Sequence, residues 1–336
     1  MCVLPAGGKL LIMSLIESRA GLHRPLVVVT AVMAVLAAVA VVGLFADPRQ
    51  LVGAPVWSKT AKFAVSIALY TATLSWMLSL LPRARRWGWW MGTAVAAGLT
   101  VEMVLIIGQT IVRGRRLHFN FATEADRFIH NQMATAVYLL WAATLVVALL
   151  LVWQRLADPA RASAIRAGLF LALTGMALGM LMFTPTPEQQ AVIDAGGEPA
   201  VVGSHSVGAP EDGPGLPLTG WSVDGGDLRI AHFAGLHALQ LIPLLAFGLE
   251  ALSRRVPVLR PAVVRRRLIR IAAVEYLGLI VLLTWQALRG QALLRPDGAT
   301  LLAAAALAVT AVAAAAAAVR TSPARLEPGQ QRGPAQ

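Results

Sequence analysis

Long apolar stretches that alternate with short polar segments dominate the hydrophobic pattern of this chain. A helix needs about 20 apolar residues to cross a bilayer, and eight stretches reach roughly that length. These stretches are residues 25–45, 61–81, 89–112, 133–153, 165–184, 229–252, 268–288 and 299–319. Backbone that faces lipid must pair its N–H and C=O groups within its own segment, so each stretch is predicted to be a helix. The pattern predicts an all-α fold, a polytopic transmembrane helix bundle of about eight spanning helices, in which the alanine-rich last stretch carries the weakest signal.

Three segments outside these stretches differ from them in composition. Residues 1–24 are predicted to be a cytoplasmic N-terminal segment, in which Met13 is an alternative start of translation. Residues 320–336 are rich in proline, glycine and glutamine and are predicted to be a disordered cytoplasmic tail. Loop 185–228 is longer than most loops, and its apolar residues favour an ordered lid over the outer face of the bundle 25–319 rather than a disordered linker.

Basic residues collect on alternate sides of the predicted helices. If the N-terminus lies inside, most of the 29 basic residues fall in cytoplasmic segments, as the positive-inside rule requires. Acidic residues show the opposite bias, because seven lie in the outer loop: Glu188, Asp194, Glu198, Glu211, Asp212, Asp224 and Asp227. Both termini are therefore predicted to be cytoplasmic, and the net charge of +12 is attributed to topology and to contact with anionic lipid. No nucleic acid is expected as a partner, because the sequence contains no recognisable nucleic-acid-binding module.

The composition indicates a membrane location and a bacterial origin. Hydrophobic residues make up 57% and charged residues 14% of the chain, whereas soluble domains carry about a quarter charged residues. Arginine replaces lysine almost throughout, and together with frequent alanine, glycine and valine this is typical of a GC-rich bacterial genome. The predicted location is the bacterial inner (cell) membrane. The single Cys2 excludes an intrachain disulfide.

Glu102 is the most informative single position. It lies about 15 Å from the outer end of the third stretch, near the middle of the bilayer, where an ionisable side chain is a functional candidate by default. Gln109 and Arg113 follow at spacings that place them on the same helical face, so the three predict a polar stripe from mid-membrane to the outer surface. Lys62 is a candidate counter-charge. The alternative is a protonated Glu102 that bonds a neighbouring helix.

A second cluster of polar residues follows the third stretch, in RGRRLHFNFATEADRFIHNQ (113–132). Its arginines run against the positive-inside trend, so a local compensation is expected. Glu124 and Asp126 can supply it, as can an anionic ligand, or the arginines can contact phosphate headgroups. His118 and Asn120 in this segment are candidate binding residues.

Five of the six histidines are predicted to lie outside the membrane or in the outer half of a helix: His118, His130, His205, His232 and His237. The last two share the stretch 229–252 with Arg229 and Gln240. At 100° per residue His232 and His237 are about 140° apart, so a straight helix cannot direct both to one metal ion. Each is expected either to bond a neighbouring helix or to belong to a site with Gln240.

Three further positions carry expectations about packing and charge. Asp227 is a predicted N-cap of the sixth helix. Gly175 and Gly179 have the spacing of small residues that let two membrane helices approach closely. Glu275, in the inner half of the seventh stretch, is a second acid within the membrane, but it has little polar company in the sequence.

Common catalytic motifs are absent from the sequence. It contains no HExxH, no phosphate-binding GxxxxGK[ST], no GxSxG and no CxxC. Two cofactor hypotheses stay open. One is haem b bound by histidines from two different helices, and the other is a divalent metal bound through His232 or His237.

Two stretches resemble a known family. RGRRLHFNFATEAD (113–126) and SHSVGAPEDGPGLPLTGWSVDGGDLRIAHFAGLHALQ (204–240) are similar to segments of an uncharacterised family of bacterial multi-pass membrane proteins. The resemblance is strongest in these stretches. It implies a membrane location and no mechanism, because no activity is established for that family.

These features predict a membrane-embedded enzyme or redox protein with a His/Glu/Arg site in the outer half of the bundle. The catalytic candidates are Glu102, His232, His237 and Gln240. The substrate-binding candidates are Lys62, Gln109, Arg113, His118, Asn120, His205 and Arg229. Besides the lipid bilayer, the expected partner is an anionic or lipidic small molecule. The alternatives are a small-solute or proton-coupled transporter, which one proline-broken helix without an inverted repeat disfavours, and an accessory structural subunit.

Overall fold

The computed structural model describes residues 21–81, 84–154 and 156–321. Most of the predicted N-terminal segment, including Met13, and all but two residues of the predicted C-terminal tail lie outside the described residues.

Eight helices that are long and apolar enough to cross a membrane make up most of the described residues. They are α2 (Arg24–Ala46), α3 (Ser58–Ser79), α4 (Arg85–Ile107), α5 (Glu124–Val152), α6 (Pro159–Leu178), α8 (Leu228–Ser253), α9 (Ala262–Leu288) and α10 (Gly298–Arg320). A π-helix, η2 (Gly108–Val112), extends α4, and a 3-10 helix, η3 (Gly179–Phe183), extends α6. The all-α fold and the eight long apolar helices are confirmed.

Helix α5 differs most from its predicted stretch, because it begins at Glu124 rather than at residue 133. Its first turns are polar, so hydropathy does not mark them. The Thr123 side chain accepts a hydrogen bond from the backbone N–H of Asp126 and caps the helix. In the sequence, the start of this helix is therefore marked by its N-cap residue and not by the beginning of the apolar stretch.

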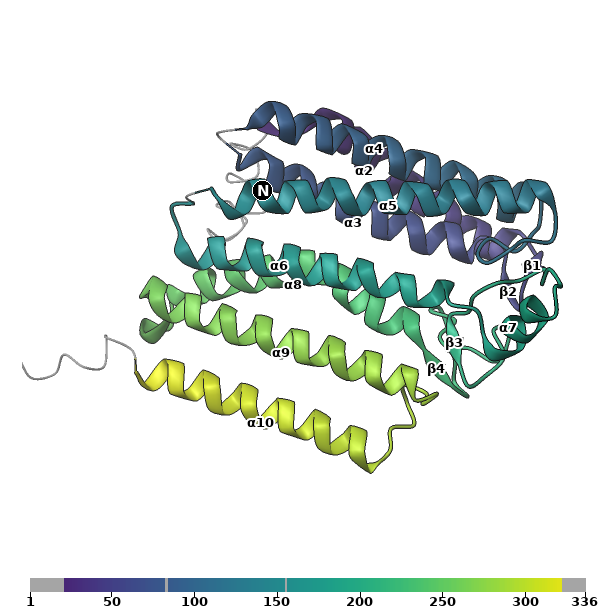
Figure 1. Cartoon of the computed structure of the whole chain (residues 1–336). Coiled ribbons are helices and arrows are strands. Elements are labelled where there is room, and N and C mark those ends of the chain that lie inside the picture. Colours follow the sequence, from purple (N-terminus) through teal and green to yellow (C-terminus); the bar gives the residue numbers. More distant parts are fainter. Residues whose placement is uncertain (1–20, 82–83, 155, 322–336) are drawn as a thin grey trace, which may run out of the picture.

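The eight helices run alternately up and down and form a bundle with two distinct ends (Figure 1). At one end α2, α4, α6 and α9 start, and the other four long helices finish; we call this the arginine end. The opposite end, called the loop end, carries the segments 47–57, 113–123, 184–227 and 289–297. The most extensive helix contacts are α6 with α8 and α2 with α3, while α10 packs chiefly on α9.

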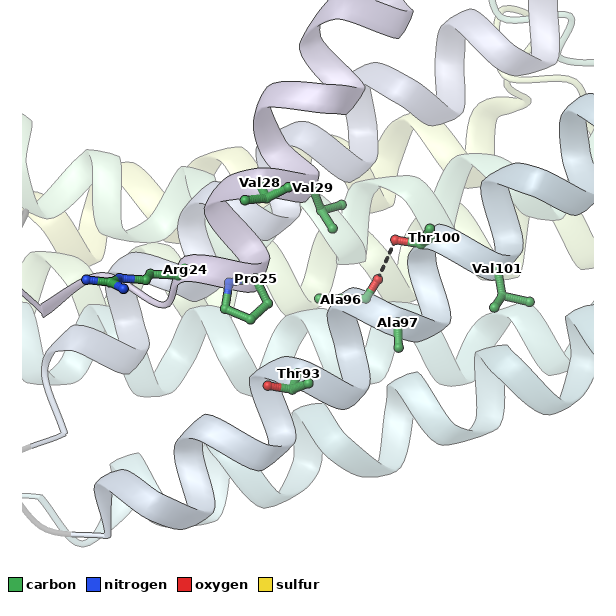
Figure 2. A pocket seen from close by; sticks show the side chains of 9 residues that line it. All are labelled: Arg24, Pro25, Val28, Val29, Thr93, Ala96, Ala97, Thr100 and Val101. Carbon is green, nitrogen blue, oxygen red and sulfur yellow. Dashed lines mark hydrogen bonds between the residues drawn. The ribbon is translucent and has the colours of Figure 1, made fainter.

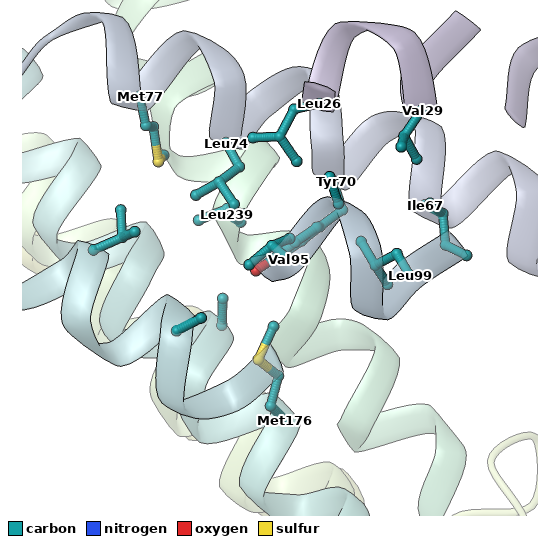
Figure 3. Close-up of a cluster of buried hydrophobic side chains, with 14 of the residues drawn as sticks. Leu26, Val29, Ile67, Tyr70, Leu74, Met77, Val95, Leu99, Met176 and Leu239 are labelled. Atoms are coloured by element: carbon teal, nitrogen blue, oxygen red, sulfur yellow. The ribbon is translucent and has the colours of Figure 1, made fainter. Parts of the chain in front are cut away.

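The main core lies among α2 to α6 and receives Leu239 from α8. Leu26, Leu74, Val95 and Leu99 point into it from three different helices (Figure 3). A second apolar cluster joins α6, α8 and α9. In contrast, the outward helix faces carry large exposed apolar side chains, such as those of Val35, Phe170, Val274 and Val312.

Glycines set the closest approach in the bundle, between α6 and α8. A Cβ atom on Gly175 would lie 2.5 Å from the Cα of Gly235, so both helices meet backbone to backbone. A Cβ atom on Gly179 would lie 3.1 Å from the His232 ring. The predicted packing role of Gly175 is thus seen in the structure, with Gly235 as its partner.

The long loop folds against the loop end. It contains α7 (Pro187–Asp194) and the strand β3 (Ser206–Val207), which pairs antiparallel with β4 (Gly226–Asp227). A β-bridge between Asn120 and Val201 ties it to the segment before α5. The smaller hairpin of β1 (Gln50–Leu51) and β2 (Ala54–Pro55) and the 3-10 helix η4 (Pro257–Leu259) complete the fold.

Candidate functional site

Glu102 lies on the buried face of α4, between Leu99 and Met103, and is 7% exposed. Its Oε2 atom is buried without a hydrogen-bond partner among the described residues. Lys62, the expected counter-charge, donates instead to the carbonyl of Thr219 in the long loop, at 3.0 Å. Glu102 is therefore an isolated buried carboxyl group in this part of the chain.

The predicted stripe from Glu102 to Arg113 is interrupted by the π-helix η2. A π-turn holds more residues than an α-turn, so spacings counted at 3.6 residues per turn no longer mark one face. Gln109 is fully buried and donates from Nε2 to Asp126 Oδ1 at 2.8 Å, while its Oε1 accepts from Arg113 at 2.6 Å. Gln109 and Arg113 thus belong to a network around Asp126 and are not bonded to Glu102.

Asp126 compensates the arginines that run against the positive-inside trend. Its side chain is 0% exposed and forms ion pairs with Arg113 at 3.2 Å and Arg115 at 2.6 Å. Arg116 pairs with Asp212 of the long loop. A local acid, one of the three compensations expected for this cluster, is therefore present. Glu124, the other acid considered, forms no ion pair within the described ranges.

A cluster of histidines and phenylalanines lies beneath the long loop. The ring centroids of His118 and His205 are 5.5 Å apart, and the Phe119 ring lies 4.8 Å from that of His205. His130 of α5 contacts the Phe121 ring at 4.6 Å. The loop reaches this position through Gly203, whose φ of +104° and contact with the Met182 carbonyl leave no room for a side chain.

Glu211 fixes the orientation of His205. The His205 Nδ1 atom is hydrogen-bonded to Glu211 Oε1. The other carboxylate oxygen accepts from the backbone N–H of His205 at 2.7 Å and from the Ser204 hydroxyl at 2.8 Å. Nε2 of His205 has no hydrogen bond to the described part of the chain. This arrangement is that of a histidine held by a carboxylate at one nitrogen and free at the other.

The protonation of this pair follows from burial and hydrogen bonding. Burial raises the pKa of Glu211, but the hydrogen bonds from His205 and Ser204 outweigh it and bring the pKa to about 2. Burial lowers the pKa of His205 below its ordinary value, although Glu211 acts in the opposite direction. Burial, followed by the charge of Lys59, lowers the pKa of His118 well below its ordinary value. At neutral pH an ionised Glu211 therefore faces two neutral imidazoles.

Lys59, in the first turn of α3, supplies a positive charge to this cluster. It is half-buried and lies close enough to His118 and His205 for its charge to act on both. Among the described basic residues of the loop end, Lys59 alone forms neither a hydrogen bond nor an ion pair with the described chain. The charge of Glu211 acts on Lys59, and an anionic group that reached the cluster would meet the same ammonium charge.

Arg229 and Lys62 hold the loop over the cluster. Arg229 pairs with Asp227 at 2.6 Å and donates to the carbonyl of Gly220, next to the Thr219 carbonyl that Lys62 contacts. Asp227 also accepts from the backbone N–H of Arg229 and caps α8, as the sequence predicts. Arg229 and Lys62 are thus bonded to the protein itself.

The remaining candidates lie apart or support the backbone. His232 bonds the Gly175 carbonyl through Nδ1 at 2.7 Å, and the Gln240 Oε1 atom is buried without a described partner. His237 makes no hydrogen bond in the described ranges. Asn120 donates to the Arg116 carbonyl and so shapes its own loop. Within residues 21–81, 84–154 and 156–321, no group of three or more His, Cys, Asp or Glu side chains is placed to hold a metal ion.

Two residues that the structure brings to His205, Glu211 and Lys59, are not among the site residues predicted from the sequence. Glu211 appeared only as one of seven loop acids, although its six-residue distance from His205 is a usable local signal. Lys59 has no distinguishing signal in the sequence beyond being one of the chain's three lysines. Lys59 becomes a candidate only because the other basic residues of the loop end form hydrogen bonds or ion pairs with the protein, and these contacts exist only in the folded chain.

Comparisons with known proteins do not extend this description, since no family model, curated protein or solved structure matches the chain.

Proposed function

We propose that the chain is a multi-pass protein of the bacterial cell membrane with both termini in the cytoplasm. The support is the charge of the two ends: loops and helix starts at the arginine end carry most of the arginines, while the long loop carries the acids. The exposed apolar faces of the helices suit contact with lipid. In this orientation the loop end faces away from the cytoplasm.

We further propose that the loop end is an acid–base catalytic site for an anionic small molecule or lipid headgroup. His205 acts as the general base through Nε2, and Glu211 holds the proton on Nδ1 and stabilises the imidazolium that forms. Lys59 binds the anionic group of the substrate or the negative charge that develops in the transition state. The single observation that carries this proposal is the carboxylate-held, neutral His205 beside a lysine without a partner in the described chain.

Two histidine variants of the purified full chain test this function. The substrates are phosphate and carboxylate ester probes with chromogenic leaving groups. We expect His205→Ala to reduce turnover by about 100-fold or more, the usual contribution of a general base. The control variant His237→Ala removes a histidine of α8, away from the loop end, and should retain the turnover of the wild type. If His205→Ala leaves turnover unchanged, His205 is not the general base and the proposal is contradicted. If only His237→Ala loses turnover, the catalytic residues lie within the helix bundle instead.

A proton-coupled transporter is the second candidate, because Glu102 is a buried carboxyl group without a described partner. Proteoliposomes that carry a pH-sensitive dye test it. A proton flux that Glu102→Gln abolishes and His205→Ala leaves intact favours transport over catalysis at the loop end.

An optical spectrum and a metal analysis of the purified protein test the hypothesis that the chain is a redox protein with haem or a metal ion bound by histidines. His232 bonds a backbone carbonyl through Nδ1 and leaves Nε2 free, as metal-binding histidines do. A Soret band that His232→Ala or His237→Ala removes supports haem. A purified protein without colour or metal contradicts the redox version.

A further inference from the structure

A shallow groove runs along the outside of the bundle between α2 and α4 (Figure 2). Its volume is 690 Å³. The lining residues come from the first turns of α2 and the middle of α4: Arg24, Pro25, Val28, Val29, Thr93, Ala96, Ala97, Thr100 and Val101. The groove therefore starts at the arginine end and stops near the centre of the bundle.

The groove is apolar along its length. Both threonine hydroxyls donate within their own helix, Thr93 to the Trp89 carbonyl at 2.9 Å and Thr100 to the Ala96 carbonyl at 2.8 Å. Small alanine side chains form its floor on α4. An occupant of this groove is expected to be a hydrocarbon rather than a polar molecule.

The mouth of the groove is positively charged. Arg24 lies at the groove's end, and Arg85 and Arg86 open α4 at the same end of the bundle. All three are exposed, and none forms an ion pair with an acid in the described part of the chain. The exposed rings of Trp89 and Trp90 lie one turn further along α4, the depth of a membrane interface in the proposed orientation.

His23 fixes the position of this mouth. Its Nδ1 atom accepts from the backbone N–H of Leu26 and caps α2, while Nε2 is bonded to the Trp89 carbonyl of α4 at 2.9 Å. The His23 ring is 5% exposed and lies next to Gly92, where a Cβ atom would come within 3.0 Å of it. The start of α2 is thus tied to α4 beside Arg24.

We propose that this groove binds one acyl chain of an anionic phospholipid, with the headgroup phosphate on Arg24. From Thr93 to Val101 the groove extends about 12 Å along α4, close to half of a hydrocarbon core of about 30 Å. That length fits one acyl chain of one leaflet and is too short for a spanning helix of a partner. The inference rests on the proposed membrane insertion and is independent of the catalytic site at the opposite end.

Native mass spectrometry of the detergent-purified full chain tests this proposal, with dioleoyl phosphatidylglycerol and dioleoyl phosphatidylcholine as probes. The wild type should retain one phosphatidylglycerol in preference to phosphatidylcholine. Arg24→Ala should lower retention of phosphatidylglycerol about fivefold, as expected for one arginine at a lipid surface. Ala97→Phe, which fills the groove from an exposed position, should lower retention of both lipids.

Arg254→Ala is the matched control, because Arg254 is also an exposed arginine at the arginine end but lies outside the groove. It should retain lipid as the wild type does, and all variants should share one melting temperature. Equal retention of the two lipids by the wild type, or retention that Ala97→Phe leaves unchanged, overturns the proposal. A dimer that Ala97→Phe dissociates assigns the groove to a second copy and also overturns it. Failure of membrane insertion would appear separately, as protein in the soluble fraction.

Discussion

At the scale of residues, His205 owes its chemistry to its immediate partners. Glu211 accepts three hydrogen bonds from residues 204–205, which keeps its carboxylate charged despite burial. The charge in turn fixes the proton of the imidazole on Nδ1. A backbone carbonyl can also fix a tautomer, as that of Gly175 does for His232, but it does not carry the negative charge that stabilises an imidazolium.

The pH dependence of stability reports on Glu211. Its folded pKa of about 2 lies below the ordinary value of 4.5, so it contributes stability above pH 4.5 that is lost as the pH falls towards 2. We expect Glu211→Gln to flatten the acid limb of the melting temperature, measured by thermal unfolding in detergent. Glu198→Gln, at an exposed carboxylate, serves as the control, and an equal effect of both variants contradicts the role given to Glu211.

Residue-level pairing was only partly predictable. The sequence places Asp126 in the same connecting segment as the arginines, 11 and 13 positions after Arg115 and Arg113, and the structure brings these side chains into contact. His205 and Glu211 are joined by the short loop turn between them, which contains Gly208 (φ +71°), whereas Lys59 approaches them from α3. Contacts of the latter kind depend on tertiary structure that a hydropathy pattern does not contain.

At the scale of elements, the segment between α4 and α5 is fixed by Asp126. Its buried carboxylate forms ion pairs with Arg113 and Arg115 and accepts hydrogen bonds from Gln109 and Thr123. Removal of the carboxylate charge therefore leaves both arginines without their ion-pair partner. We expect Asp126→Asn to destabilise this segment by at least about 2 kcal/mol. Limited digestion with trypsin should then cleave at 113–116 faster than in the wild type. Glu124→Gln should not accelerate cleavage, and an equal rate in the wild type and Asp126→Asn contradicts the network.

The contact between α6 and α8 depends on two glycines. Gly235→Ala places a methyl group against the backbone of Gly175, so the helices must separate. We expect a loss of about 1–3 kcal/mol, the usual cost of overpacking, seen as a lower melting temperature. Gly98→Ala is the matched control, because a Cβ atom there meets nothing within 4 Å. Helix propensity alone would leave Gly98→Ala neutral or more stable, so comparable losses in the two variants would contradict the packing role given to Gly235.

The long helices were predictable as elements because their apolar runs match the thickness of a bilayer. Their polar ends were not, as the start of α5 at Glu124 illustrates. The π-helix η2 also escaped prediction, since nothing in a 3.6-residue pattern marks an added residue in a turn. That single irregularity separates Gln109 from Glu102 and redirects it to Asp126.

At the scale of the whole molecule, the two candidate binding sites lie at opposite ends of the bundle. The arginine end carries the groove proposed to bind lipid, and the loop end carries His205, Glu211 and Lys59 under a folded loop. We propose that the loop end faces away from the cytoplasm, where an anionic substrate would reach it. Orientation decides which pool of molecules meets the site.

Alkaline phosphatase fusions test that claim most directly, because the enzyme is active only outside the cytoplasm. A fusion after Ala200, in the long loop, should be active in intact bacteria. A fusion after Arg255, at the arginine end, should be inactive at equal expression. An inactive fusion after Ala200 together with an active one after Arg255 would place the His205 site in the cytoplasm and contradict the account.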